Sequence, residues 1–153
     1  MSKLVAPTAK VPAMSQEAIA DLQAFQTVLL QLPQAEIATH HVLHGGMYTR
    51  TIKLAKGVFI VGALVKVPTT LIVNGDCTVN LGGEPVRLTG YCVIPASAQR
   101  KQAFVAHEDT YLTMSFRTNA TTVMEAEDEF TDEATALLSR LPDSNNEIII
   151  TGE

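Results

Sequence analysis

The sequence has 153 residues, of which 46% are hydrophobic and 18% are charged, and its formal net charge is −5. This length suits one domain with a hydrophobic core, and the acidic balance gives no support for direct nucleic-acid binding. The low charged fraction favours additional surface buried against a partner.

Charge is divided unequally along the chain. Residues 1–120 contain ten Lys and Arg and seven Asp and Glu, whereas residues 121–153 contain one Arg and nine Asp and Glu. This division predicts either head-to-tail contacts between copies of the chain or an acidic segment that simply faces solvent.

Two segments precede the main body of the chain. Residues 1–14 alternate small residues, Pro and Lys, which predicts an extended arm. Ser15 is a suitable N-cap for an amphipathic helix over residues 15–32, and Pro33 ends it. The arm and the helix are expected either to hold a neighbouring subunit or to cover one end of the chain's own barrel.

Residues 36–120 predict a β-barrel. Short runs rich in Val, Ile, Thr, Phe and Tyr alternate with turn residues, and no long helix interrupts them. We expect hairpin turns at Asn74-Gly75-Asp76, because an Asn-Gly pair favours a type I′ turn, and at Thr89-Gly90. The predicted strands cover 37–44, 47–54, 58–66, 69–73, 76–81, 86–88, 91–94, 102–107 and 110–117. The fold class is therefore mainly β, as a jelly-roll barrel.

Residues 121–153 form an acidic C-terminal segment. Thr131, followed by Asp132 and Glu133, predicts the start of a short helix that Pro142 ends. The final EIIITGE predicts a strand, which either completes the chain's own sheet or pairs with a sheet edge of another subunit.

The N-terminal MSKLVAPTAKVPAM lacks the apolar run of a signal peptide. The sequence contains no run of about 18 apolar residues, which is the length that a membrane span requires. We therefore expect no membrane partner. Cys77 and Cys92 lie in apolar, strand-like surroundings, which favours buried free thiols over a disulfide.

The spacing of glycines resembles the two motifs of the cupins, G-x5-H-x-H-x3/4-E-x6-G and G-x5-P-x-G-x2-H-x3-N. When the motifs are aligned from Gly57 and Gly90, the histidines and the glutamate that would bind a metal are absent. The residues at those positions are Ala63, Val65, Thr69 or Thr70, and Arg100. The resemblance implies a cupin-like jelly roll with no metal and no cofactor. With Leu71, Ala63 and Val65 then predict a filled core at the mouth of the barrel.

A second resemblance is carried by HVLHGGMYTRTIKLAKGVFIVGALVK and by AHEDT, and it covers about residues 38–130. This outline is similar to small cupin-like proteins of tailed phages and prophages. The matching residues are His41, Gly45, Tyr48, Arg50, Ile52, Gly75 and 106–110. The resemblance implies a location in the virion or the host cytoplasm, with a homo-oligomer and other phage structural proteins as partners.

Four residues are candidates for ligand binding: Tyr48, Arg50, Arg100 and His107. Tyr48 and Arg50 share a strand face and are expected to line a shallow pocket, although Tyr48 also suits a half-buried strand position. Arg100, with Lys101 and near Arg87, suits an anion or a neighbour's acidic segment.

No residue is predicted to bind a metal or to act in catalysis. In H-H-x-x-H, His40 and His44 face one way on a strand and His41 the other, so we expect ordinary surface or turn histidines. No nucleophile, phosphate-loop or metalloprotease motif is present, and no local pattern favours a Cys–His107 pair.

The sequence therefore favours a non-catalytic, metal-free, cupin-like phage protein that acts through self-association, as a virion or assembly component. The first alternative is a protein that sequesters a small ligand without a metal, which requires an accessible cavity in the barrel. The second alternative is a cupin-type enzyme with an unorthodox site.

Overall fold

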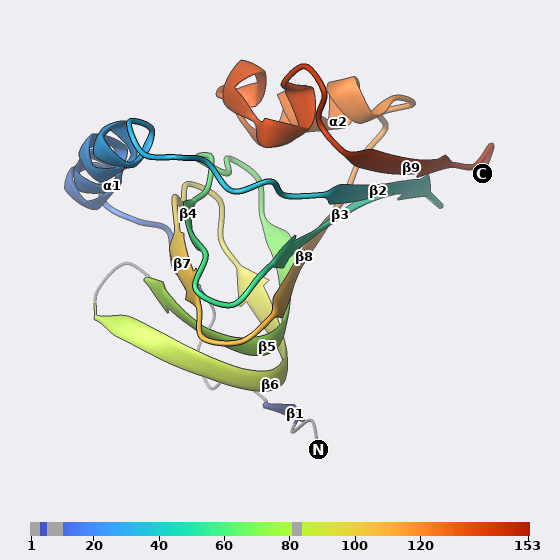
Figure 1. Cartoon of the computed structure of the whole chain (residues 1–153). Helices are drawn as coiled ribbons and strands as arrows, with labels where there is room; N and C mark the ends of the chain where they lie inside the picture. The colour runs from blue at the N-terminus through green and yellow to red at the C-terminus, as the bar shows by residue number, and fades with distance from the viewer. Residues whose placement is uncertain (1–3, 6–10, 81–83) are drawn as a thin grey trace.

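The computed structural model describes residues 4–5, 11–80 and 84–153 (Figure 1). Within these ranges the chain forms a nine-stranded sheet, two α-helices and two short 3-10 helices. The strands are β1 (Leu4–Val5), β2 (Thr39–His44), β3 (Met47–Leu54), β4 (Phe59–Val61), β5 (Thr69–Asn80), β6 (Pro85–Ala96), β7 (Ala103–Ala106), β8 (Thr110–Arg117) and β9 (Asn146–Ile150).

The sheet follows the order β1-β6-β5-β8-β3-β2-β9, and β7 pairs with both β4 and β5. It curls into a half-barrel, with α1 (Gln16–Leu29) and α2 (Val123–Phe130) near one end (Figure 1). The predicted fold class is confirmed, because a mainly β, curled sheet with two helices is consistent with a jelly roll.

The curl depends on β5, which changes partner halfway along its length. Residues 77–79 pair with β7, whereas residues 70–74 pair with β8. Gly75 lies at the change of partner, with φ +149°, and a Cβ there would approach Thr110 Oγ1 to 2.5 Å and Asp109 O to 2.7 Å. Glycine is therefore required for the close approach of two backbones.

The predicted turns at Asn74-Gly75-Asp76 and Thr89-Gly90 are consequently wrong. Gly75 and Gly90 oppose each other inside one long β5–β6 hairpin. Asn-Gly is a strong turn signal only when the chain reverses there. Here the same glycine allows a continuous strand to bend.

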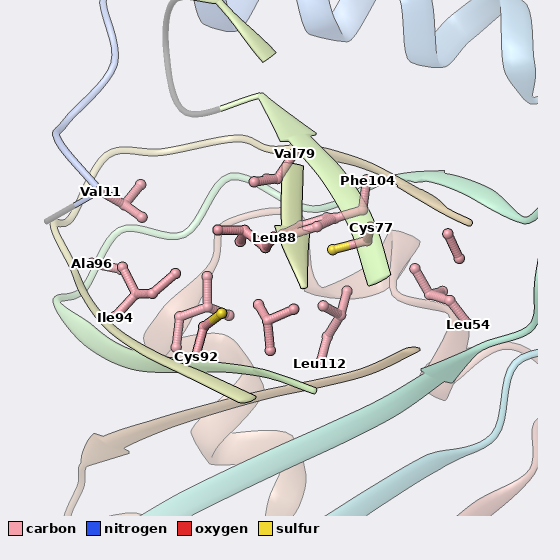
Figure 2. Packing of buried hydrophobic residues seen from close by; sticks show 13 residues of the cluster. Val11, Leu54, Cys77, Val79, Leu88, Cys92, Ile94, Ala96, Phe104 and Leu112 are labelled. Carbon is pink, nitrogen blue, oxygen red and sulfur yellow. The ribbon is translucent and has the colours of Figure 1, made fainter. Parts of the chain in front are cut away.

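The main core lies between the inner faces of β5, β6, β7 and β8 (Figure 2). Cys77 and Cys92 are buried in it as free thiols, as predicted. Val11 is also fully buried in this cluster, and its N–H donates to Pro95 O at 2.8 Å. The end of the expected arm therefore packs on the chain's own barrel.

Helix α1 begins as predicted, because Ser15 Oγ accepts a hydrogen bond from the Ala18 N–H at 3.1 Å. Leu22 is buried in a small cluster with Met14 and Ala103, so the helix covers one end of its own barrel. The far end of the helix and the residues after it leave Val28, Leu30 and Leu32 exposed.

The C-terminal helix was predicted to start at Thr131, but α2 covers Val123–Phe130 and so ends where the predicted helix would begin. Thr122 caps α2 through a hydrogen bond from the Glu125 N–H, and Thr131 ends that helix. Residues after Thr131 form 3-10 helices at Ala134–Ala136 and Leu138–Arg140. The predicted start is therefore wrong. Phe130, at the end of α2, packs into the core together with Phe116, and this contact favours a helix over the residues before Thr131.

Strand β9 pairs in parallel with β2 and so completes the chain's own sheet. It is an edge strand, and its Ile148, Ile149 and Ile150 remain 52%, 60% and 50% exposed. Across the described ranges, no helix has the length and apolar character needed to span a bilayer.

Candidate functional site

The curled sheet encloses an open cavity of about 270 Å³, which we call the cup. Its walls are mainly apolar and include Ile37, Ile52, Ile60, Leu71, Phe104 and Leu112. Ala63, Val65 and Leu71 all line the cup, so the predicted filled core at the mouth of the barrel is wrong, although Leu71 is itself buried in the main core. Gly62, Ala63 and Val65 face the cup with short side chains, which do not reach across the space inside the sheet.

Three of the side chains lining the cup are charged: Arg50, Arg100 and Glu133. Each is held by a different element, since Arg50 lies in β3, Arg100 just before β7 and Glu133 after α2. Their partners determine which of these charges is available to a ligand.

Arg50 is paired with a buried carboxylate. Its Nη1 contacts Glu127 Oε2 at 2.8 Å, its Nη2 donates to Ser139 Oγ at 3.0 Å, and its guanidinium lies over the Phe130 ring. Glu127 is 1% exposed and also accepts from Arg140 Nε at 2.9 Å. Burial alone would raise the pKa of Glu127, but hydrogen bonds from Ser139, Arg140 and Arg50 hold it below its ordinary value.

Glu133 is likewise neutralised within the chain. The Lys101 ammonium is fully buried and lies 3.1 Å from Glu133 Oε2, which also accepts from the Leu64 N–H at 3.0 Å. Burial opposes ionisation of Glu133, yet the Leu64 and Lys101 contacts lower its pKa. The acidic segment thus supplies its own chain with the counter-ion of Lys101.

Arg100 has no such counter-ion. The residue is 2% exposed, and in the described part of the chain no carboxylate forms an ion pair with it. Nη1 donates to Ser97 O at 2.6 Å and to Val67 O at 3.4 Å, and Nη2 donates to Thr69 Oγ1 at 2.6 Å. Burial lowers the pKa of Arg100 to about 10.

Gln102 lies beside this guanidinium and lines the cup. Its Oε1 accepts from Arg100 Nε at 3.3 Å. Its Nε2 is buried and has no hydrogen-bond partner among the described residues, and the whole residue is only 6% exposed. A buried amide donor without an acceptor is costly, by about 1–3 kcal/mol.

The predicted ligand residues are placed in different regions. Arg50 and Arg100 line the cup, whereas Tyr48 lies behind Arg50, with its hydroxyl 3.2 Å from Nη1. His107 contacts Thr78 Oγ1 through Nε2 at 2.6 Å and is not part of the lining. Arg87 pairs with Asp76 and also lies outside the lining.

The histidines near β2 alternate between the two faces as strand periodicity predicts, but the expected surface position is wrong for His41. His41 is buried between the Tyr48 hydroxyl and Asn146 Oδ1, each at 2.7 Å, whereas His40 and His44 are exposed. Burial lowers the pKa of His41. Its contact with Asn146 attaches the C-terminal strand to the barrel.

The residues present do not fit a cupin metal. The lining contains no His or Cys, and its single carboxylate, Glu133, is already bound by Lys101. Throughout the described ranges, no three His, Cys, Asp or Glu side chains are grouped to hold an ion. Arg100, aligned with the histidine of the second motif, places a cationic side chain in the cup wall.

Sequence reasoning missed Gln102 and Glu133. The available signal was a polar side chain, Gln102, directly before the apolar run AFVA of β7. In a strand that faces the inside of a barrel, such a residue marks a polar spot in an apolar wall.

The sequence matches no known protein family and no curated protein. Solved structures of similar shape include proteins that are described as cupins. Ectoine synthase from P. lautus is 13% identical, with a TM-score of 0.48 over 65% of this chain and 76% of that chain. A cupin superfamily protein from Desulfitobacterium hafniense DCB-2 is 12% identical, with a TM-score of 0.47 over 72% and 100%.

KdgF from Halomonas sp. is 21% identical, with a TM-score of 0.46 over 59% of this chain and 87% of that chain. Likenesses at this level carry no information on activity. Function in a protein depends on the chemistry of its site and not on its fold, and here that site is the cup.

Proposed function

We propose that the protein binds a small molecule in the cup without the help of a metal. The observation that carries this proposal is the open cavity of about 270 Å³ with a mainly apolar wall and a few convergent polar groups. Ligand sites in proteins have this composition, and the volume lies just below the range of about 300–1,000 Å³ typical of drug-sized ligands.

The test is native mass spectrometry of untagged protein purified without chelator, combined with a variant that fills the cup. Ala63→Phe places a ring in the cup wall and is expected to remove the co-purified small molecule. Ala55→Phe adds the same side chain at an exposed turn outside the lining and serves as the control. An adduct that persists in Ala63→Phe, or a stoichiometric metal, would argue against this function.

A second candidate is self-association as a component of a phage particle or of its assembly. Strand β9 favours it, because this edge strand exposes three consecutive isoleucines, so that apolar side chains lie on both of its faces. A second copy of the chain is the partner that would cover them.

This candidate predicts an oligomer in solution that Ile149→Lys disrupts, as measured by light scattering after gel filtration. Thr151→Lys adds the same charge just beyond β9 and is the control. A wild-type monomer at micromolar concentration would rule out this candidate and would leave ligand binding in the cup unaffected.

A further inference from the structure

The cup contains one charge that the chain itself does not balance. Of the three charged side chains in the lining, Arg50 is paired with Glu127 and Glu133 with Lys101. Arg100 is 2% exposed, and no carboxylate of the described residues forms an ion pair with its guanidinium. A buried cation without an anion is costly, and a bound anion would remove this cost.

The guanidinium is also held in a fixed position. Backbone carbonyls of Ser97 and Val67, the Thr69 hydroxyl and the Gln102 amide oxygen accept four of its hydrogen bonds. A guanidinium has five N–H groups, so one N–H on Nη2 has no acceptor in the described part of the chain. A preorganised donor of this kind loses little entropy when it binds an anion.

Gln102 provides a second donor beside the first. Its Nε2 is the one buried side-chain N or O atom without a hydrogen-bond partner in the described residues, and the side chain lines the cup. Two neighbouring N–H donors, one of them cationic, match an acceptor group that has two oxygens and one negative charge. A carboxylate is the smallest such group.

The rest of the cup is suited to an uncharged, apolar body. Ile37, Ile52, Phe104 and Leu112 line it, and the other charged groups are already neutralised. A second charge on the ligand would therefore meet apolar side chains and would be poorly solvated.

We infer that the cup takes a small monocarboxylate with an apolar body, whose carboxylate is bound by Arg100 and Gln102. This inference rests on the proposed binding function and adds the chemical class of the ligand. Gln102 orients the carboxylate through its free amide N–H, and Arg100 supplies the charge.

The first experiment compares probes that share a body and differ in the head group. Octanoate, 1-octanol and octylamine, with phenylpropionate and 3-phenylpropanol as an aromatic pair, are titrated calorimetrically into the full-length protein after any co-purified small molecule is removed. Each carboxylate is expected to bind at least tenfold more tightly than its alcohol, and octylamine is expected to be the weakest aliphatic probe.

A single isosteric substitution tests the role of Gln102. Gln102→Glu places a carboxylate of the chain itself beside Arg100, where the ligand's carboxylate is inferred to bind. The variant is expected to melt at a higher temperature without ligand and to bind octanoate at least tenfold more weakly, with 1-octanol affinity unchanged. Gln16→Glu adds the same charge at an exposed position outside the lining of the cup, and should retain octanoate binding.

The outcomes separate this inference from the proposed function. Equal affinity for octanoate and 1-octanol, or full octanoate binding by Gln102→Glu, would overturn the carboxylate inference while leaving the cup a binding site. Failure of every probe to bind would also overturn the inference. The native mass spectra of wild type and Ala63→Phe then decide separately whether the cup binds another ligand.

Discussion

Arg50 and Arg100 line the same cavity, but their surroundings differ. Arg50 belongs to a closed cluster in which the two cations, Arg50 and Arg140, are balanced by Glu127 and Asp128, and in which Ser139 and the Tyr48 hydroxyl add hydrogen bonds. Among the described residues, Arg100 is bound only by neutral acceptors, and its neighbour Gln102 retains an unpaired amide N–H. Burial alone therefore does not distinguish an arginine with a structural role from one that is available to bind a ligand. The difference lies in whether the chain supplies a carboxylate that pairs with the guanidinium.

The closed cluster has a structural role that follows from its position. Glu127 lies in α2, Arg50 in β3 and Arg140 in the second 3-10 helix, so the cluster joins the C-terminal segment to the sheet. His41 and Asn146 extend the connection to β9. This explains why the acidic segment is packed on the barrel instead of facing solvent throughout.

The largest effect on stability is expected from Glu127→Gln. Removing the carboxylate leaves the Arg50 guanidinium without an anion and Arg140 with only the exposed Asp128, which should lower the free energy of unfolding by about 3–5 kcal/mol. Urea unfolding measures the change. Glu125→Gln, on the exposed face of the same helix, should change it by less than about 0.5 kcal/mol, and similar losses in both variants would contradict the assignment.

The same substitution at the two arginines tests the comparison directly. Arg50→Met is expected to cost about 2–3 kcal/mol, because Glu127 loses a charged hydrogen bond. Arg100→Met should leave ligand-free stability within about 1 kcal/mol of wild type, since the lost hydrogen bonds are offset by removal of an unbalanced charge. If Arg100→Met proved as destabilising as Arg50→Met, Arg100 would be a structural residue.

The smallest effect is expected from pH, through His41. Burial lowers the pKa of His41 below 6.5, so the unfolded chain binds a proton more readily than the folded protein. The contribution of neutral His41 to stability should therefore be fully present above pH 6.5, the ordinary pKa of the unfolded chain. It should be lost as the pH falls from 6.5 towards the lower pKa of the folded protein. Unfolding free energies at about pH 7.5 and about pH 5.5 measure the loss.

The control for this pH dependence lies on the same strand. His41→Gln should reduce the loss of stability on acidification, whereas His40→Gln, at the exposed neighbouring position, should retain it. An unchanged pH dependence in His41→Gln would assign the effect to other groups.

Local patterns were sufficient where a single segment determines its own structure. The Ser15 cap, the alternation of His40 and His41 on β2, and the free thiols of Cys77 and Cys92 were predicted from neighbouring residues. Strand periodicity and capping depend on backbone geometry within a few residues, so they are visible in the sequence.

The sequence by itself thus determined a mainly β chain with an N-terminal helix and no residues for a cupin metal at the aligned positions. Only the tertiary structure decided that Gly75 lies within a strand, because the reason is its contact with Thr110, 35 residues later. Likewise, it decided that Arg50 is neutralised by Glu127, 77 residues away, while Arg100 is not. Charge balance in a buried site depends on distances in space, which the order of residues does not specify.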